Sequence, residues 1–158
     1  MSTLRPWKNG SNMDINELTE GTTIFIPVFL KGGLIWTGDS HCAQGNGEVN
    51  LTAIECSFEE IRLQPIVRKD MKLTWPRIET KTHFIQVGFD EDLMKAFTNA
   101  LNETVDFLTT SKGLDRYEAY SLASVAADCR VSQVVDVRKG VHCMVPKSIF
   151  TASKTAGK

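Results

Sequence analysis

The sequence predicts an α+β fold, mainly antiparallel β in sandwich-like sheet layers, with two helices in the C-terminal half. Two patterns carry this prediction. Apolar and polar residues alternate with a period of two from residue 54 to 64, which is typical of half-buried antiparallel strands. From Leu93 to Leu108 the apolar residues instead recur at helical spacing. With 158 residues the chain fits one domain that buries a substantial core.

Composition narrows the class of protein. The chain is 42% hydrophobic and 23% charged, as soluble globular proteins are. Its net charge of −1 offers no electrostatic footprint for nucleic acid or an anionic membrane surface, so neither is expected as a partner. The apolar runs are far short of a membrane span, and the first residues lack the apolar segment of a signal peptide. We therefore expect a cytoplasmic protein.

The four cysteines are widely spread and form no C-x-x-C pair. We expect buried thiols, because disulfide frameworks belong mostly to small secreted domains. Cys42 is the exception to watch, since it stands beside His41 in a polar loop. Catalysis by Cys42 is kept as a less favoured alternative. A nucleophilic thiol needs a base placed beside it, and the sequence alone does not show one.

The N-terminal part is expected to start with a flexible approach over residues 1–10, followed by a single domain over residues 11–150. Residues 21–30 read as a strand, and Pro27 within it favours a sheet edge or a bulge. A glycine turn then leads to a short strand over residues 34–37.

The middle of the chain is expected to stay β as far as residue 87. Residues 71–75 and 83–87 supply two further short strands. His83 opens the second of them, where a surface or packing role is the more ordinary reading than a ligand role.

A helix is predicted to run from Asp90–Asp92, where the helix dipole favours negative charge, to Gly113 as its stop. Its apolar stripe is Leu93, Phe97, Leu101, Val105 and Leu108, widened by Met94 and Ala100. A second helix is predicted over residues 115–127. Its inward-facing residues are expected to be Tyr117, Tyr120 and Val125.

After the second helix, Asp128–Arg130 is expected to connect to a strand over residues 131–137. Gly140 turns the chain into a last strand over residues 141–145. The small, polar and basic tail, residues 151–158, is expected to be disordered.

The segment Gly38–Glu48 is the candidate site. Three glycines separate an aspartate, a histidine, a glutamine and a glutamate, and flanking apolar runs would hold such a loop on a rigid scaffold. An ordinary polar turn is the alternative, although a turn gains nothing from His41, Gln44 and Glu48 together.

Asp39, His41 and Glu48 are donors of the kind that hold zinc or another divalent ion. In an extended segment the spacing of Asp39 and His41 puts both side chains on one side. A bound ion would lower the pKa of water, and a nearby carboxylate could take the proton. This predicts hydrolysis of a small polar bond. Asn12 and Asp14 alternate in the same way, although a helix cap or Asx turn explains them equally well.

The loop resembles the G-D-x-H-x-x-Q-G-x-G-E signature of the acetamidase/formamidase family. The similarity extends from about Asn9 to Phe150, as several separated motifs in the same order, and the chain corresponds to the C-terminal portion of the longer family members. The other similar segments are Asn12–Asp14, Pro27–Val28, Val87–Leu93, Ala119–Ser124 and Asp128–Val131.

This resemblance implies a β-sandwich-like fold with α/β additions and a metal-assisted site that cleaves short aliphatic amides to carboxylate and ammonia. Zinc is the first candidate for the ion and calcium the second. As expected partners we take a small amide substrate and either a second copy of the chain or a companion chain that supplies the N-terminal half. The roles we assign are catalysis by Glu48, metal binding by Asp14, Asp39 and His41, and substrate binding by Asn12 and Gln44.

Two other functions stay open at this point. One is a non-catalytic binding or assembly module that keeps the amidase fold. The other is a structural metal site without turnover.

Overall fold

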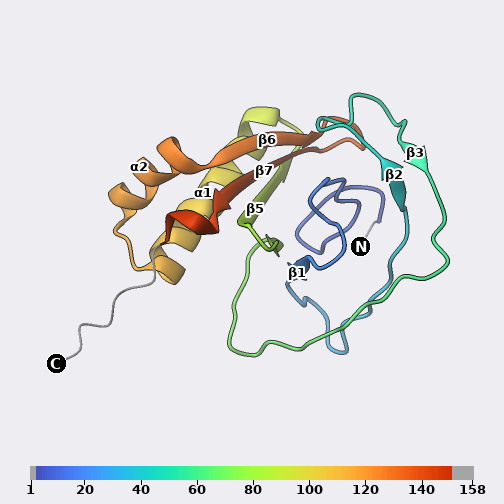
Figure 1. Ribbon diagram of the computed structural model, residues 1–158, viewed down its shortest axis with the longest axis horizontal. Helices are drawn as coiled ribbons and strands as arrows, with labels where there is room; N and C mark the ends of the chain where they lie inside the picture. Colours follow the sequence, from blue (N-terminus) through green and yellow to red (C-terminus); the bar gives the residue numbers. More distant parts are fainter. Residues whose placement is uncertain (1–2, 151–158) are drawn as a thin grey trace.

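A five-stranded antiparallel sheet carries helices on one face and the N-terminal segment on the other (Figure 1). The computed structural model describes residues 3–150. Two long neighbouring strands, β5 and β7, pair along their full length and form the centre of the sheet. The predicted α+β class is confirmed. In spatial order the strands are β1 (Thr23–Phe25), β4 (Arg77–Glu79), β5 (His83–Asp90), β7 (Lys139–Pro146) and β6 (Asp128–Gln133).

Helix α1 (Leu93–Lys112) and helix α2 (Arg116–Ala126) begin and end where the sequence predicts. The Asp92 side chain accepts a hydrogen bond from the backbone of Lys95 and so caps the start of α1. Gly113 ends α1 in the left-handed conformation, with φ of 74°. A reciprocal capping box between Asp115 and Glu118 starts α2. A short 3₁₀ turn, η1 (Lys147–Ile149), follows β7.

The predicted stripe of α1 is confirmed only in part, since Ala100, Val105 and Leu108 are buried as expected. A Cβ on Gly88 of β5 would lie 2.3 Å from backbone atoms of Ala96 and Ala100, so the helix rests directly on the strand. Such close contact requires small residues, and Ala96 and Ala100 are therefore buried, whereas Leu93 and Phe97 are partly exposed.

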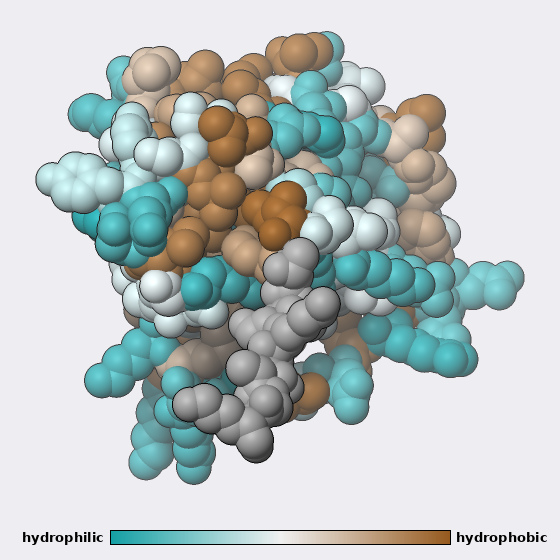
Figure 2. Space-filling view, turned by 60° about the vertical axis from the view of Figure 1, so that its left-hand side comes forward, coloured by the Kyte–Doolittle hydropathy of each residue, from teal (hydrophilic) through white to brown (hydrophobic). Residues whose placement is uncertain are grey.

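The inward face predicted for α2 is also wrong. Figure 2 brings forward the side of the molecule on which α2 lies, and it shows apolar side chains at the surface there. Tyr117, Tyr120 and Val125 are largely exposed. The buried residues of α2 are Ala119 and Ala123, which pack against α1 and β7.

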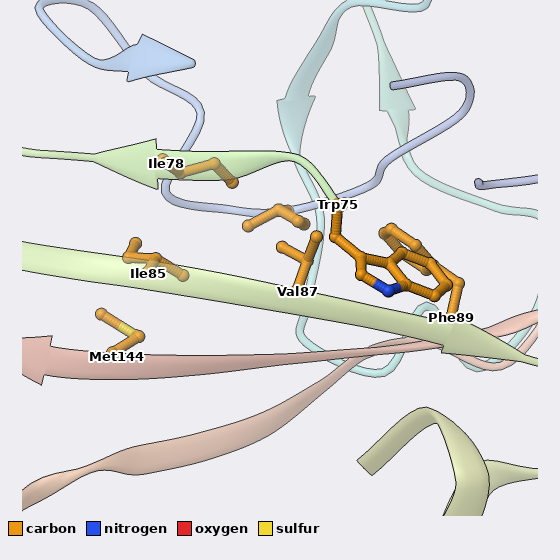
Figure 3. Close-up of a cluster of buried hydrophobic side chains, with 7 residues drawn as sticks. Trp75, Ile78, Ile85, Val87, Phe89 and Met144 are labelled. Carbon is orange, nitrogen blue, oxygen red and sulfur yellow. The ribbon is translucent and has the colours of Figure 1, made fainter. Parts of the chain in front are cut away.

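The core on the opposite face of the sheet is aromatic and aliphatic (Figure 3). Its members are Ile15, Trp75, Ile78, Ile85, Val87, Phe89 and Met144. Trp7 meets Trp75 edge to face, with ring centroids 5.0 Å apart, and Pro6 is fully buried. Residues 6 and 7, which we expected to belong to a flexible approach, are thus packed against the core.

Residues 26–74, here called the apolar arm, hold little of the predicted β structure. The arm runs as a wide loop around the N-terminal segment and contains only a two-stranded ribbon, β2 (His41–Ala43) with β3 (Ile54–Glu55) (Figure 1). The predicted strands over residues 34–37 and 71–75 do not form. The alternating residues Phe58, Ile61 and Leu63 are exposed, because no described segment covers them.

Smaller corrections concern the strand ends. The strand predicted over residues 21–30 shortens to β1, which does lie at the sheet edge, as Pro27 suggested. Asp128–Arg130 belongs to β6 and is no connection, and β6 ends at Gln133. The tail over residues 151–158 lies outside the described residues.

The cysteine prediction is wrong for one pair. Cys129 and Cys143 stand opposite each other in the register of β6 and β7 and form a disulfide beneath α1. The two cysteines are 14 residues apart in the sequence, and they become neighbours only when β6 and β7 pair as a hairpin. Cys42 and Cys56 are free. Among the described residues, no helix combines the length and hydropathy needed to cross a membrane.

Candidate functional site

Side chains from four separate segments converge on one cavity of about 160 Å³. These segments are the N-terminal turn, the loop before and after β2, strand β3 and the turn between β6 and β7. The residues that line the cavity include five acidic residues and His41. The lining residues are Leu4, Asn12, Asp14, Asp39, His41, Glu48, Leu51, Glu55 and Asp136.

Asp14, Asp39 and His41 form a cluster that could hold a metal ion, since one donor atom of each lies within 4.8 Å of the others. His41 Nε2 is 3.1 Å from Asp39 Oδ1, and His41 Nδ1 is 4.0 Å from Asp14 Oδ2. Two carboxylates and an imidazole match the donor set of zinc, while calcium would prefer more oxygen ligands. The three residues predicted for the metal are thus brought together.

His41 is held in place by its neighbours. Gln44 Oε1 lies 2.6 Å from Nδ1, which places the amide oxygen to accept a hydrogen bond from the tautomer that is protonated at Nδ1. Nε2 then faces Asp39 and, at 3.3 Å, Glu55 Oε1. Burial lowers the pKa of His41, but the bond with Gln44 and the surrounding carboxylates outweigh it, and the pKa lies above its ordinary value.

Glu48 and Asp14 form a carboxyl pair behind the histidine. The Glu48 side chain is buried and hydrogen-bonded with the Asp14 carboxyl, while its Oε2 has no partner among the described residues. Burial and the negative charges of Asp14 and Asp136 raise the pKa of Glu48 to about 8. Burial and Asp39 also raise the pKa of Asp14. The pair therefore retains a proton near neutral pH, which suits a group that exchanges protons with a substrate.

The backbone directs these side chains inward at left-handed turns. Asn12, Asp39, Glu48 and Asp136 all have positive φ, of 42°, 61°, 33° and 61°. Asn and Asp tolerate this conformation, whereas Glu48 is strained there. Backbone strain such as that of Glu48 is typical of functional sites, and here four residues with positive φ surround one cavity.

The two residues predicted to bind substrate make hydrogen bonds within the protein. The Asn12 amide donates to Asp136 Oδ2 at 2.8 Å and to the Leu4 carbonyl at 2.7 Å. Gln44 contacts His41, as described above. Their role toward a substrate stays a prediction.

Asp136 and Glu55 belong to the site but escaped the sequence analysis. Glu55 stands in the alternating segment as an outward position of a strand, which gives no sign of a site. Asp136 lies in a run of β-branched residues, and a lone carboxylate within such a run is the only signal that could have singled it out.

Cys42 lies on the ribbon with His41, and its side chain is exposed. A hydrogen bond with Cys42 raises the pKa of the Cys56 thiol to about 11, which disfavours its reactive thiolate form. These thiols are next to the cavity without lining it.

Fold and site together define a class of α+β proteins that set an acidic, imidazole-containing cavity beside an antiparallel sheet. The chain belongs to the Acetamidase/Formamidase family, whose profile matches residues 1–152.

Named relatives agree with this assignment. An acetamidase from Mycolicibacterium smegmatis is 48% identical over 48 residues, which are 30% of this chain and 12% of the relative. A formamidase from Methylophilus methylotrophus is 43% identical over 47 residues, again 30% of this chain and 12% of the relative.

Solved acetamidase structures share the fold. The acetamidase from Yersinia enterocolitica superimposes with a TM-score of 0.83 at 26% identity, over 96% of this chain and 46% of its own. For the acetamidase from Bacillus halodurans the TM-score is 0.83 at 29% identity, over 95% of this chain and 50% of its own. The chain thus spans about half the length of these solved relatives.

Proposed function

We propose that this protein hydrolyses small linear amides of the formamide and acetamide type to carboxylate and ammonia, with the help of a divalent ion. The observation that carries the proposal is the convergence of Asp14, Asp39 and His41 beside the buried carboxyl of Glu48. The names of the relatives, acetamidase and formamidase, support the choice of substrate class. The donor set favours zinc, with calcium second.

Each residue of the site has a separate role in the proposed hydrolysis. A bound ion would supply the polarisation of the amide carbonyl and the acidification of water. The charge of a bound ion would lower the pKa of Glu48 from about 8 and leave its carboxylate free to accept a proton. Glu48 then takes the proton of the attacking water and delivers it to the nitrogen of the departing ammonia. Asp14 would hold the ion beside Glu48, and Gln44 keeps the His41 ring in its orientation.

The cavity accommodates only a small substrate. A volume of about 160 Å³ is well below the roughly 300–1,000 Å³ of pockets that bind drug-sized ligands. Leu4 and Leu51 provide apolar wall next to the polar residues, which suits the short alkyl group of an acetamide-type substrate. We place the substrate amide near Asn12 and Gln44.

Elemental analysis together with an ammonia-release assay on formamide and acetamide tests the proposal. Bound metal with turnover supports it. Metal without turnover would replace it with a structural metal site. Neither metal nor turnover would leave a binding or assembly module built on the amidase fold.

We also propose that the apolar arm is covered by further polypeptide. Leu34 is 97% exposed and Trp36 64%, and exposed apolar surface of this extent marks an interaction site. Because the solved relatives are about twice as long, the remainder of the family fold is the first candidate for this cover. A second copy of the chain is the alternative.

A further inference from the structure

The last residue of β6, Gln133, contacts two site segments that are far apart in the sequence. Its side chain is completely buried. Gln133 Oε1 accepts a hydrogen bond from the backbone N–H of Asp14 at 3.2 Å, across 119 residues of sequence. The end of β6 therefore fixes the position of the segment that supplies one candidate metal ligand.

The backbone at the same point holds the turn before Glu48. Gly47 and Gln133 form an isolated parallel bridge, and the Gly47 N–H donates to the Ser132 carbonyl at 3.0 Å. Gly47 has φ of 98°, and Glu48 follows it with φ of 33°. The direction in which the Glu48 carboxyl points is thus set where its turn is joined to β6.

Stability alone does not explain a glutamine at this position. Gln133 Nε2 is buried and has no hydrogen-bond partner among the described residues. A buried donor without a partner is destabilising, and Gln86 carries the same cost. What distinguishes Gln133 from Gln86 is the hydrogen bond that its Oε1 accepts from the Asp14 backbone.

We infer that Gln133 is a positioning residue, which holds Asp14 and the Glu48 turn in the arrangement that brings the metal donors and the carboxyl pair together. The inference rests on the proposed function in taking Asp14 as a metal ligand. Residues behind the ligands of a metal site commonly change metal affinity by about 10–100-fold when they are replaced.

The test uses Gln133→Met, which keeps side-chain length but removes the amide. Gln86→Met is the matched control, because Gln86 is equally buried on β5 with both amide atoms unpaired among the described residues. Gln86 stands opposite Cys143, whose side chain packs against α1. Zn²⁺ affinity and the hydrogen exchange of the Asp14 amide are measured for each variant.

Gln133→Met is expected to weaken Zn²⁺ binding by about 10–100-fold and to speed exchange of the Asp14 amide. Gln86→Met should change neither. Parental values of both quantities in Gln133→Met, or an equal loss of affinity in Gln86→Met, would overturn the inference.

Gln133→Glu provides the second variant, since it retains the Oε1 acceptor and should keep the Asp14 amide protected. If Gln133→Met does not fold, loss of that protection in Gln133→Glu overturns the inference and its retention supports it. A parent protein without Zn²⁺ affinity would refute the proposed function, while exchange of the Asp14 amide would still decide the role of Gln133.

Discussion

Glu48 is the residue whose surroundings most constrain its chemistry, since it is buried, strained in its backbone and paired with another carboxyl. Glu48→Gln keeps the shape of the side chain and removes its proton acceptor. Because general base catalysis contributes about 10²–10⁴-fold, ammonia release should fall by at least about 100-fold. The exposed Glu59→Gln serves as the control. Activity of Glu48→Gln close to that of the parent would remove Glu48 from the mechanism.

His142 gives a prediction that is independent of the candidate site. Burial lowers the pKa of His142 below its ordinary 6.5, and the charge of Glu17, 3.2 Å away, offsets this only in part. The unfolded chain therefore binds the proton more readily than the native one, and stability should be lost as the pH falls below about 6.5.

Denaturant unfolding on either side of that pH checks the His142 prediction. His142→Gln should show a smaller loss of unfolding free energy on acidification than the parent. His83→Gln, at the partly exposed start of β5, should behave like the parent. Equal pH dependence in the parent and His142→Gln would contradict the assignment.

At the scale of single residues, the sequence predicted the core of the site but not all the residues that belong to it. Asp14, Asp39, His41 and Glu48 were all singled out, because they stand in polar, turn-rich segments that a core does not need. Asp136 and Gln133 were missed, since each lies at or after the end of a β-branched strand. Their proximity to the loop depends on how β6 is placed in the sheet.

At the scale of the elements, α1 rests directly on β5 at Gly88. Gly88→Ala would bring a Cβ to within 2.3 Å of the α1 backbone, so the helix must shift. Overpacking of this kind costs about 1–3 kcal/mol, and the free energy of unfolding should fall by that amount. Gly45→Ala, which meets no atom within 4 Å, is the control. Unchanged stability of Gly88→Ala would show that α1 is free to move.

The ends of the helices could be predicted because caps are local chemistry: Asp92, Asp115 and Gly113 act on neighbouring backbone groups. The buried face of α1 could be predicted only in part, as Val105 and Leu108, and that of α2 could not, since large apolar residues usually mark the inner face of a helix. Here the close approach at Gly88 selects alanines instead. Likewise, alternation over residues 54–64 indicates strands only if another layer covers them.

For the whole molecule, the apolar arm predicts association. The chain alone should self-associate with rising concentration, and the double substitution Leu34→Ser and Trp36→Ser should reduce this, because it removes two exposed apolar groups. Light scattering gives the molar mass. Tyr117→Ser with Val125→Ser removes similarly exposed side chains from α2 and should leave association unchanged. An effect of the α2 pair alone would place the contact elsewhere.

The most direct test of the central claim is a titration of the chelator-treated protein with Zn²⁺, followed by calorimetry, for the parent and for His41→Ala. The parent is predicted to show a single saturable site, and His41→Ala is predicted to lose it, because the imidazole is the only nitrogen donor of the described cluster. Saturable binding that is equally tight in His41→Ala, or no binding by the parent, would contradict a metal centre at Asp14, Asp39 and His41.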